Sequence, residues 1–484
     1  MKPLCDFSAT TLRRMIGTKE ISPVELLASC IDRIERCNKP LNAIVVKNYV
    51  KARKEAKRLE KAVLAGEDLG LLHGLPIGIK DLEVTKELKT TFGSRLYKNN
   101  IPRSDQRTIS SIRSSGGVVV AKTNTPEFGA GANTTNLVYG ATGNPFNPDL
   151  TCGGSSGGSA VALATGMVPL ATGSDYGGSL RIPAGFCGVV GFRPSPGFVP
   201  DETRTVGLSP YSVLGPMGRT VDDAILLLGA MIGYDRRDPF SRLRENSILE
   251  PLPIVDLSKL RVAVSEDLGV ASVDNSIRKI FRERVKSFKH VFAKMEYRDP
   301  KFDQDLHEAF EIIRAVNFEA QHGKLLRRYR RYLGENVIVN TELCQKYSAS
   351  DVAWANRQQT IYYKNFLRLM DRFDVLISPT NSVSPFPHKK LFVEKINGKT
   401  LPSYMRWLSP TYVLTMVLPP ACSIPCGRDH KNMPFGIQIS AARGSDRFIL
   451  SAAKALEKVF SGDEKTVRAI PEISKLQENS NEHA

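Results

Sequence analysis

Cysteine is sparse in this sequence, with 8 residues among 484. So dilute a set cannot form a disulfide framework, and it indicates a reducing compartment. The closest pair, Cys422 and Cys426, is followed by no second pair at zinc-ligand spacing, so we expect no metal. Long apolar runs are also missing, because none reaches the ~18 residues that a membrane span requires. With no signal segment at the N-terminus, these absences predict a cytoplasmic protein without membrane contact.

Positive charge is in excess, since 67 Lys and Arg residues against 50 Asp and Glu residues give a net charge of +17. Such a balance raises nucleic acid as a partner if the charges cluster. The densest run is KLLRRYRR at residues 324–331, and a second gathers in a Lys-rich segment, 45–64, that we expect to be one helix with Val50 on its apolar face. Both fit solvated helix faces, so a nucleic-acid-binding protein is the least favoured alternative.

The order of apolar segments is typical of an α/β protein. Ser22, followed by Pro and then Glu25, predicts a helix start. Short apolar runs such as LPIGIK, GGVVVAKT, DVLIS and FGIQIS alternate with turn residues and helical periodicity, as buried strands do. No repeat or long linker divides the chain, so we expect one α/β domain over 1–484.

A glycine-rich segment, CGGSSGGSAVALATG at residues 152–166, places two serines ahead of an apolar helix. Glycine allows a close backbone approach to a bound group, and a helix N-terminus presents free N–H groups. The segment lacks the Gly-Lys-Ser/Thr ending of a phosphate loop. A hydrolase elbow at Ser155 or Ser156 would need a downstream catalytic histidine, and none of the histidines has a suitable context.

A second glycine-bracketed serine, Ser179 in GSDYGGSLRIPA, and a lysine, Lys80 in GIKD, suggest different chemistry. Desolvation disfavours the ammonium form of a buried lysine, so a neutral lysine can act as a general base. A serine between this base and the nucleophile can relay the proton. These residues predict a Ser-Ser-Lys triad, which needs neither histidine nor cofactor.

The motifs GLPIGIKD, KTNTPEF, GATGNPFNP and GGSSGGSAVALATG, together with GSDYGGSLRIPAGFCGVVGFRPS, DVLISPT and PFGIQIS, make the sequence resemble the amidase signature family. The resemblance covers the chain from its N-terminal helices to its last helix. It implies an α/β fold with a large mixed central sheet covered by helices on both faces. It also implies a signature core at about 70–215 and a helical, pocket-forming region at about 300–430.

Carried over by position, the resemblance makes Ser179 the nucleophile, Ser155 the bridging serine after a cis Gly154–Ser155 peptide bond, and Lys80 the base. The separations of 75 residues (155 − 80) and 24 residues (179 − 155) match the family. The implied enzyme is an amidase that hydrolyses a small-molecule amide to an acid and ammonia or an amine. It requires no cofactor.

The resemblance also implies binding residues around the nucleophile. The family's oxyanion hole corresponds to the backbone N–H groups of Tyr176, Gly177, Gly178 and Ser179. A family position that contacts substrate falls on Gly129, where many relatives carry a larger residue, so a wider pocket is expected.

One alternative within the family is the glutaminase component of a tRNA-dependent amidotransferase. Those components carry a Ser-Ser-Leu-Asp-Gln stretch after the signature, whereas this sequence reads LSPYSVLGPMGRT, so a free-standing amidase is favoured. The sequence does not decide the oligomeric state, a homodimer included, or the identity of the amide.

Overall fold

The computed structural model describes residues 2–241 and 252–476, and its described strands include an 11-stranded sheet. The order across this sheet is β1-β3-β2-β8-β10-β9-β16-β17-β13-β11-β12. Its strands are β1 (Ile44–Lys47), β2 (Pro76–Lys80), β3 (Val118–Thr123), β8 (Leu170–Asp175), β9 (Val190–Arg193), β10 (Val213–Gly218), β11 (Arg261–Val264), β12 (Lys294–Tyr297), β13 (Val375–Pro379), β16 (Ala421–Arg428) and β17 (Pro434–Ser440). Strands β2 and β11 run parallel to both of their neighbours, and the other pairs are antiparallel. The expected mixed sheet is therefore confirmed.

Three short ribbons lie outside this sheet. They are β4 (Thr135–Asn136) with β5 (Gly140–Ala141), β6 (Gly143–Asn144) with β7 (Asn147–Thr151), and β14 (Lys395–Ile396) with β15 (Lys399–Thr400).

Helices cover both faces of the sheet. They are α1 (Ala9–Gly17), α2 (Pro23–Leu41), α3 (Tyr49–Ala65), α4 (Arg107–Ser114), α5 (Gly157–Ala164), α6 (Arg181–Cys187), α7 (Val221–Met231), α8 (Asn275–Phe288), α9 (Asp305–Tyr329), α10 (Glu335–Glu342), α11 (Ala349–Met370), α12 (Ser409–Thr415) and α13 (Asp446–Ser461). On one face α7 packs on β10 and α13 on β16, while α3 packs on β3 and α5 on β8 on the other. None of the described helices is both long and apolar enough to cross a membrane.

The run of valines in β3 shows how the sequence specifies this layered arrangement. Val119 packs in the core cluster beneath α7 and α13, whereas Val118 and Val120 pack in the cluster beneath α3 and α5. Successive side chains of a strand point to opposite faces, so a central strand covered on both sides needs apolar residues at every position.

One predicted element was wrong in its first turn. Residues 45–64 were expected to form a single helix, but Val45–Lys47 belong to β1, which pairs with the edge of β3, and the helix begins only at Tyr49. Consecutive β-branched residues favour a strand where an edge is available for pairing. Val50, expected on the apolar face, is 69% exposed, because the register of α3 turns Ala52, Ala56 and Leu59 inward instead.

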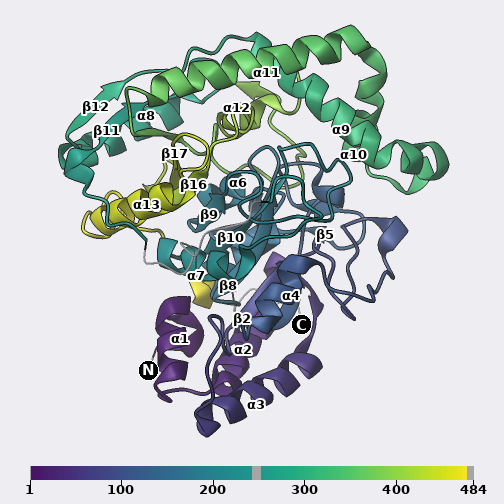
Figure 1. Ribbon diagram of the computed structural model, residues 1–484, viewed down its shortest axis with the longest axis vertical. Helices are drawn as coiled ribbons and strands as arrows, with labels where there is room; N and C mark the ends of the chain where they lie inside the picture. The colour runs from purple at the N-terminus through teal and green to yellow at the C-terminus, as the bar shows by residue number, and fades with distance from the viewer. Residues whose placement is uncertain (1, 242–251, 477–484) are drawn as a thin grey trace.

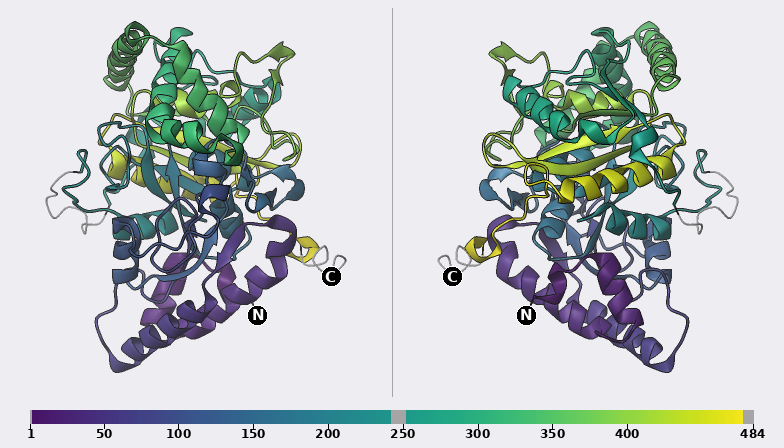
Figure 2. Two further views of the ribbon diagram at one scale, coloured as in Figure 1. Left: turned by 90° about the vertical axis from the view of Figure 1, so that its right-hand side faces the viewer. Right: turned by 90° about the vertical axis from the view of Figure 1, so that its left-hand side faces the viewer.

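Figure 1 shows the helices α9, α11 and α12 packed together above the central strands. In both views of Figure 2 the N-terminal helices lie at one end of the long axis and the α9–α11 region lies at the other. The segment 305–370 thus forms a helical layer over the sheet.

Candidate active site

Neighbouring strands bring together residues that are far apart in the sequence. Lys80 is the last residue of β2 and Asp175 the last of β8, and these two strands pair in parallel. Ser155 and Ser156 lie in the loop before α5, and Ser179 lies in the loop between β8 and α6. Because the carboxyl ends of parallel strands open on the same edge of a sheet, the predicted lysine and serines converge there.

The Lys80 side chain ends among three serine hydroxyls. Its Nζ lies 2.7 Å from Oγ of Ser155 and 2.9 Å from Oγ of both Ser156 and Ser174. Its backbone N–H donates to Thr172 Oγ1 at 3.1 Å, which fixes the end of β2 against β8. The lysine has no exposed surface, so water does not solvate its amine.

Burial lowers the pKa of Lys80 from 10.5 to about 7, although the carboxylates of Glu83 and Asp175 oppose this shift. Desolvation destabilises the ammonium form more than the two acids stabilise it. Near neutral pH the amine is therefore available to accept a proton.

The structure confirms the expected cis peptide bond between Gly154 and Ser155. Two of the lysine contacts, Ser156 and Ser174, were not predicted to touch it. Ser156 stands next to Ser155 in the glycine-rich segment, and Ser174 lies near the end of the strand that pairs with β2, so both positions carried a signal in the sequence.

Asp175 holds the loop that carries Ser179. Its carboxylate accepts hydrogen bonds from the backbone N–H groups of Gly178 (2.8 Å) and Leu180 (3.2 Å) and forms ion pairs with Arg181 (3.0 Å) and Arg193 (3.2 Å). Burial alone would raise the pKa of Asp175, but the two guanidinium groups hold it well below its ordinary value. This buried network fixes the backbone around the predicted nucleophile.

Gly178 lies in a turn where its backbone N–H already has an acceptor. Its N–H, which the resemblance assigns to the oxyanion hole, donates to Asp175 in this structure. Its φ is +129°, and a Cβ atom would lie 2.2 Å from Thr411 Oγ1, so only glycine fits this turn. The other N–H groups expected to face an oxyanion are those of Tyr176, Gly177 and Ser179.

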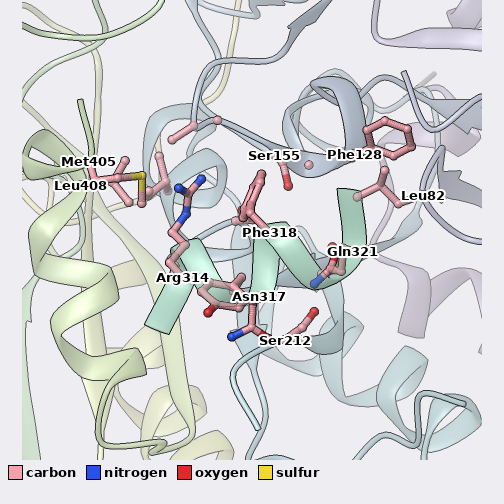
Figure 3. A pocket seen from close by; sticks show the side chains of 18 of the residues that line it. Leu82, Phe128, Ser155, Ser212, Arg314, Asn317, Phe318, Gln321, Met405 and Leu408 are labelled. Carbon is pink, nitrogen blue, oxygen red and sulfur yellow. The ribbon is translucent and has the colours of Figure 1, made fainter. Parts of the chain in front are cut away.

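A cavity of about 130 Å³ opens beside these serines (Figure 3). It is lined by Leu82, Phe128, Gly129, Gly131, Ala132, Ser155, Ser174, Tyr176, Gly177, Ser179, Ile182, Ser212, Arg314, Asn317, Phe318, Gln321, His322, Met405 and Leu408. We call it the catalytic cavity. Ser155 and Ser179 both line it, and no hydrogen bond joins their side chains among the described residues. Such contacts often tighten only when substrate binds.

Gly129 lies directly beside Ser155, the predicted bridging serine. Its φ is +72°, and a Cβ atom built on it would be 3.3 Å from Ser155 Oγ and 3.0 Å from Leu82 Cδ1. A larger residue would therefore occupy space next to the hydroxyl of Ser155.

One wall of the catalytic cavity is a face of α9 that sequence reasoning did not identify residue by residue. Arg314, Asn317, Phe318, Gln321 and His322 all line the cavity, and their spacing of three, four, seven and eight residues after the first places them on one helix face. The signal available in the sequence was that polar residues recur here at the spacing of a buried helix face. They lie within the region 300–430 expected to form the pocket.

A second cavity of about 470 Å³ adjoins the first and shares eight lining residues with it, among them Leu82, Phe128 and Tyr176. Glu83 lines this second cavity, and its side chain is buried. Burial raises the pKa of Glu83 to about 7. A second group that titrates near neutrality thus lies close to Lys80 in the sequence and in the fold.

Comparison with known proteins finds relatives along nearly the whole chain. Residues 25–450 match the protein-family model described as Amidase. The chain is 32% identical over 454 residues to an acylamidase of Rhodococcus erythropolis, covering 93% of this chain and 95% of that protein. It is 30% identical over 477 residues to the A component of the glutamyl-tRNA(Gln) amidotransferase of Acaryochloris marina, covering 93% of this chain and 97% of the relative.

Among solved structures, a bacterial aryl acylamidase of the amidase signature enzymes superimposes with a TM-score of 0.88 at 29% identity. The alignment covers 94% of this chain and 97% of the other. The likeness therefore extends through the sheet, the glycine-rich segment and the helical layer.

Proposed function

The chain belongs to the amidase family and is a hydrolase of amide C–N bonds, and we propose that it acts through an acyl-enzyme on Ser179, with Lys80 as base and Ser155 as proton relay. The observation that carries this proposal is the Lys80 amine, which is fully buried and lies 2.7 Å from Ser155 Oγ in the wall of the catalytic cavity.

In the first half-reaction, neutral Lys80 takes the proton of Ser155, which takes the proton of Ser179 as its Oγ attacks the amide carbonyl carbon. The tetrahedral intermediate then collapses. The proton returns from Lys80 through Ser155 to the leaving nitrogen, the C–N bond breaks, and ammonia or an amine departs. Water attacks the resulting ester by the same proton route, and the acid is released.

The negative charge on the carbonyl oxygen needs preorganised donors. We assign these to the backbone N–H groups of Tyr176, Gly177 and Ser179. The rigid network of Asp175 supports this assignment, because donors that need no reorganisation contribute most, about 2.7–4 kcal/mol each.

The relatives suggest two substrate classes. Similarity to the relatives named acylamidase and aryl acylamidase supports simple acyl amides and anilides as substrates of this chain. Similarity to the A components of glutamyl-tRNA(Gln) amidotransferases supports glutamine instead. The segment LSPYSVLGPMGRT, which lacks the stretch typical of those amidotransferase components, supports a free-standing amidase.

The proposal places the enzyme in the cytoplasm, either as a single chain or as a homodimer. All eight cysteines are free thiols, and seven of them are buried, which supports a reducing compartment.

Mass spectrometry of the intact protein during turnover tests the nucleophile. The enzyme is mixed with a panel of aliphatic amides, anilides and glutamine, and the expected result is an acyl adduct on the peptide that contains Ser179. The variant Ser179→Ala should lose the adduct and at least about 10³-fold in kcat while it keeps its thermal unfolding transition.

The matched control is Ser110→Ala on the exposed surface of α4, which should keep full activity. Amide hydrolysis retained by Ser179→Ala, or an adduct on another residue, contradicts the assignment. Hydrolysis of glutamine that depends on a partner protein would instead support the amidotransferase alternative.

A further inference from the structure

Among the described residues that line the catalytic cavity, Arg314 is the only one with a charged side chain of the Arg, Lys, Asp or Glu type. It belongs to α9 and is 6% exposed. Figure 3 shows its guanidinium pointing from the helix into the cavity, between Leu408 and Phe318. The wall of the cavity therefore carries a positive charge.

The groups that hold this guanidinium are neutral. It donates hydrogen bonds to the side-chain oxygens of Asn340 and Tyr404, and it stacks over the rings of Phe318, at 4.3 Å from the centroid, and Tyr404, at 5.5 Å. A guanidinium has five N–H donors in a planar fork, and these two bonds leave donors for a ligand. The contacts fix the position of the fork without neutralising its charge.

No carboxylate ion pair is found for Arg314 among residues 2–241 and 252–476. On α9 the acid one turn before it, Glu311, accepts a hydrogen bond from Tyr347. Asp175, near the nucleophile, is paired with Arg181 and Arg193. Buried charges in proteins are usually paired with an opposite charge. The guanidinium of Arg314 therefore lacks the counter-ion that a buried cation normally has.

The acids of the adjoining cavity do not belong to the lining of the catalytic cavity. Glu83 and Asp201 line the adjoining cavity, and Asp201 lies 3.6 Å from the guanidinium of Arg204. The described lining of the catalytic cavity therefore offers no carboxylate to bind an ammonium group of a substrate.

Two further polar groups point to a ligand at the same place. Tyr176 and His322 both line the catalytic cavity, and the Tyr176 hydroxyl and the His322 Nδ1 atom are buried without a hydrogen-bond partner among the described residues. Burial, together with the charge of Arg314, lowers the pKa of His322 to about 4, so its imidazole is neutral. These groups can complete the hydrogen bonds of a bound anion or of the amide next to it.

We propose that Arg314 binds a carboxylate of the substrate, so that the enzyme prefers amides that carry one carboxylate and no ammonium group. A guanidinium fork matches both oxygens of a carboxylate and forms charge-assisted hydrogen bonds with it. The carboxylate can belong to the acyl portion or to the amine portion. The inference rests on the proposed function, because it assumes that the amide reacts at Ser179 in the same cavity.

Pairs of substrates of equal shape test the preference. Succinamate is compared with 4-methylpentanamide for the acyl portion, and N-acetyl-β-alanine with N-(3-methylbutyl)acetamide for the amine portion. In each pair an isopropyl group replaces the carboxylate. The wild-type enzyme should show a kcat/KM at least about tenfold higher for the charged member of one pair, which identifies the side that faces Arg314.

The variant Arg314→Gln should lower kcat/KM for that charged amide about 10–100-fold and leave its neutral partner within about threefold. Arg314→Lys, which keeps the charge but not the fork, should recover part of the loss. Arg327→Gln, on the exposed end of the same helix, is the matched control and should change neither rate.

A wild-type enzyme that prefers the neutral member of both pairs overturns the inference, whether or not the variants fold. Equal losses on charged and neutral amides in Arg314→Gln also overturn it, because they indicate a structural role only. If the wild-type enzyme hydrolyses neutral amides with an adduct on Ser179 but shows no preference, the proposed function stands and the inference alone fails. If no amide forms an adduct, both fail.

Discussion

In the proposed mechanism, the pH dependence of activity follows from the burial of Lys80. A lysine with the ordinary pKa of 10.5 would be neutral in about one molecule in 3000 at pH 7, whereas a pKa of about 7 makes about half of the molecules neutral. Only the neutral amine accepts a proton, so kcat/KM should fall about tenfold for each pH unit below 7 and reach a plateau above pH ~8.

The assay is release of 4-nitroaniline from 4′-nitroacetanilide between pH 5 and 10, because neither the substrate nor the product titrates in that range. Since kcat/KM reports the free enzyme, its midpoint should equal the pKa of Lys80. Circular dichroism at each pH distinguishes loss of activity from loss of fold.

Glu83 also titrates near neutrality, so the variant Glu83→Gln separates the two groups. The carboxylate of Glu83 raises the pKa of Lys80, and its removal should therefore move the acid limb to lower pH while preserving the slope. A flat profile or an acid limb that disappears in Glu83→Gln would refute the assignment of Lys80 as the base. A midpoint near pH 10 would instead refute the lowering of its pKa by burial.

Two further substitutions test the surroundings of the triad. Gly129→Ala places a methyl group 3.3 Å from Ser155 Oγ, so kcat/KM for bulky amides should fall more than kcat/KM for acetamide. Because the φ of Gly129 is +72°, the substitution should also cost ~1–2 kcal/mol of stability. The control Gly66→Ala, at a φ of +74° in open space, should cost a similar amount of stability without changing the selectivity. Asp175→Asn leaves two buried guanidinium groups unpaired and should lower the free energy of unfolding by about 3–5 kcal/mol in urea titrations, together with activity. The exposed variant Asp256→Asn is the control, and an equal effect from both would contradict the buried network.

Much of the fold was predictable because its signals are local. The predicted helix start at Ser22 is confirmed, with Ser22 forming a capping box with Glu25, and the apolar run of β3 becomes a strand buried on both faces. The error at residues 45–47 has a non-local cause. Whether Val45 and Val46 join a helix or a strand depends on an available edge of β3, which lies more than 70 residues later in the chain.

The candidate site divides in the same way. Lys80, Ser155 and Ser179 were identified because glycine-rich motifs mark them, and the parallel pairing of β2 and β8 then brings their loops to one edge of the sheet. The contacts of Ser156 and Ser174 with the lysine could not be predicted, because they depend on the directions of side chains from three separate segments.

The sequence by itself determined the proposed chemistry, because the types and spacing of the lysine and serines are written in short motifs. The tertiary structure alone decided the environment: the burial that lowers the pKa of Lys80, the use of the Gly178 N–H by Asp175, and the placement of Arg314 in the cavity that the serines line. Burial, charge pairing and cavity shape depend on contacts between distant segments. In the functions proposed above, the helical layer therefore selects the substrate, whereas the motifs set the reaction.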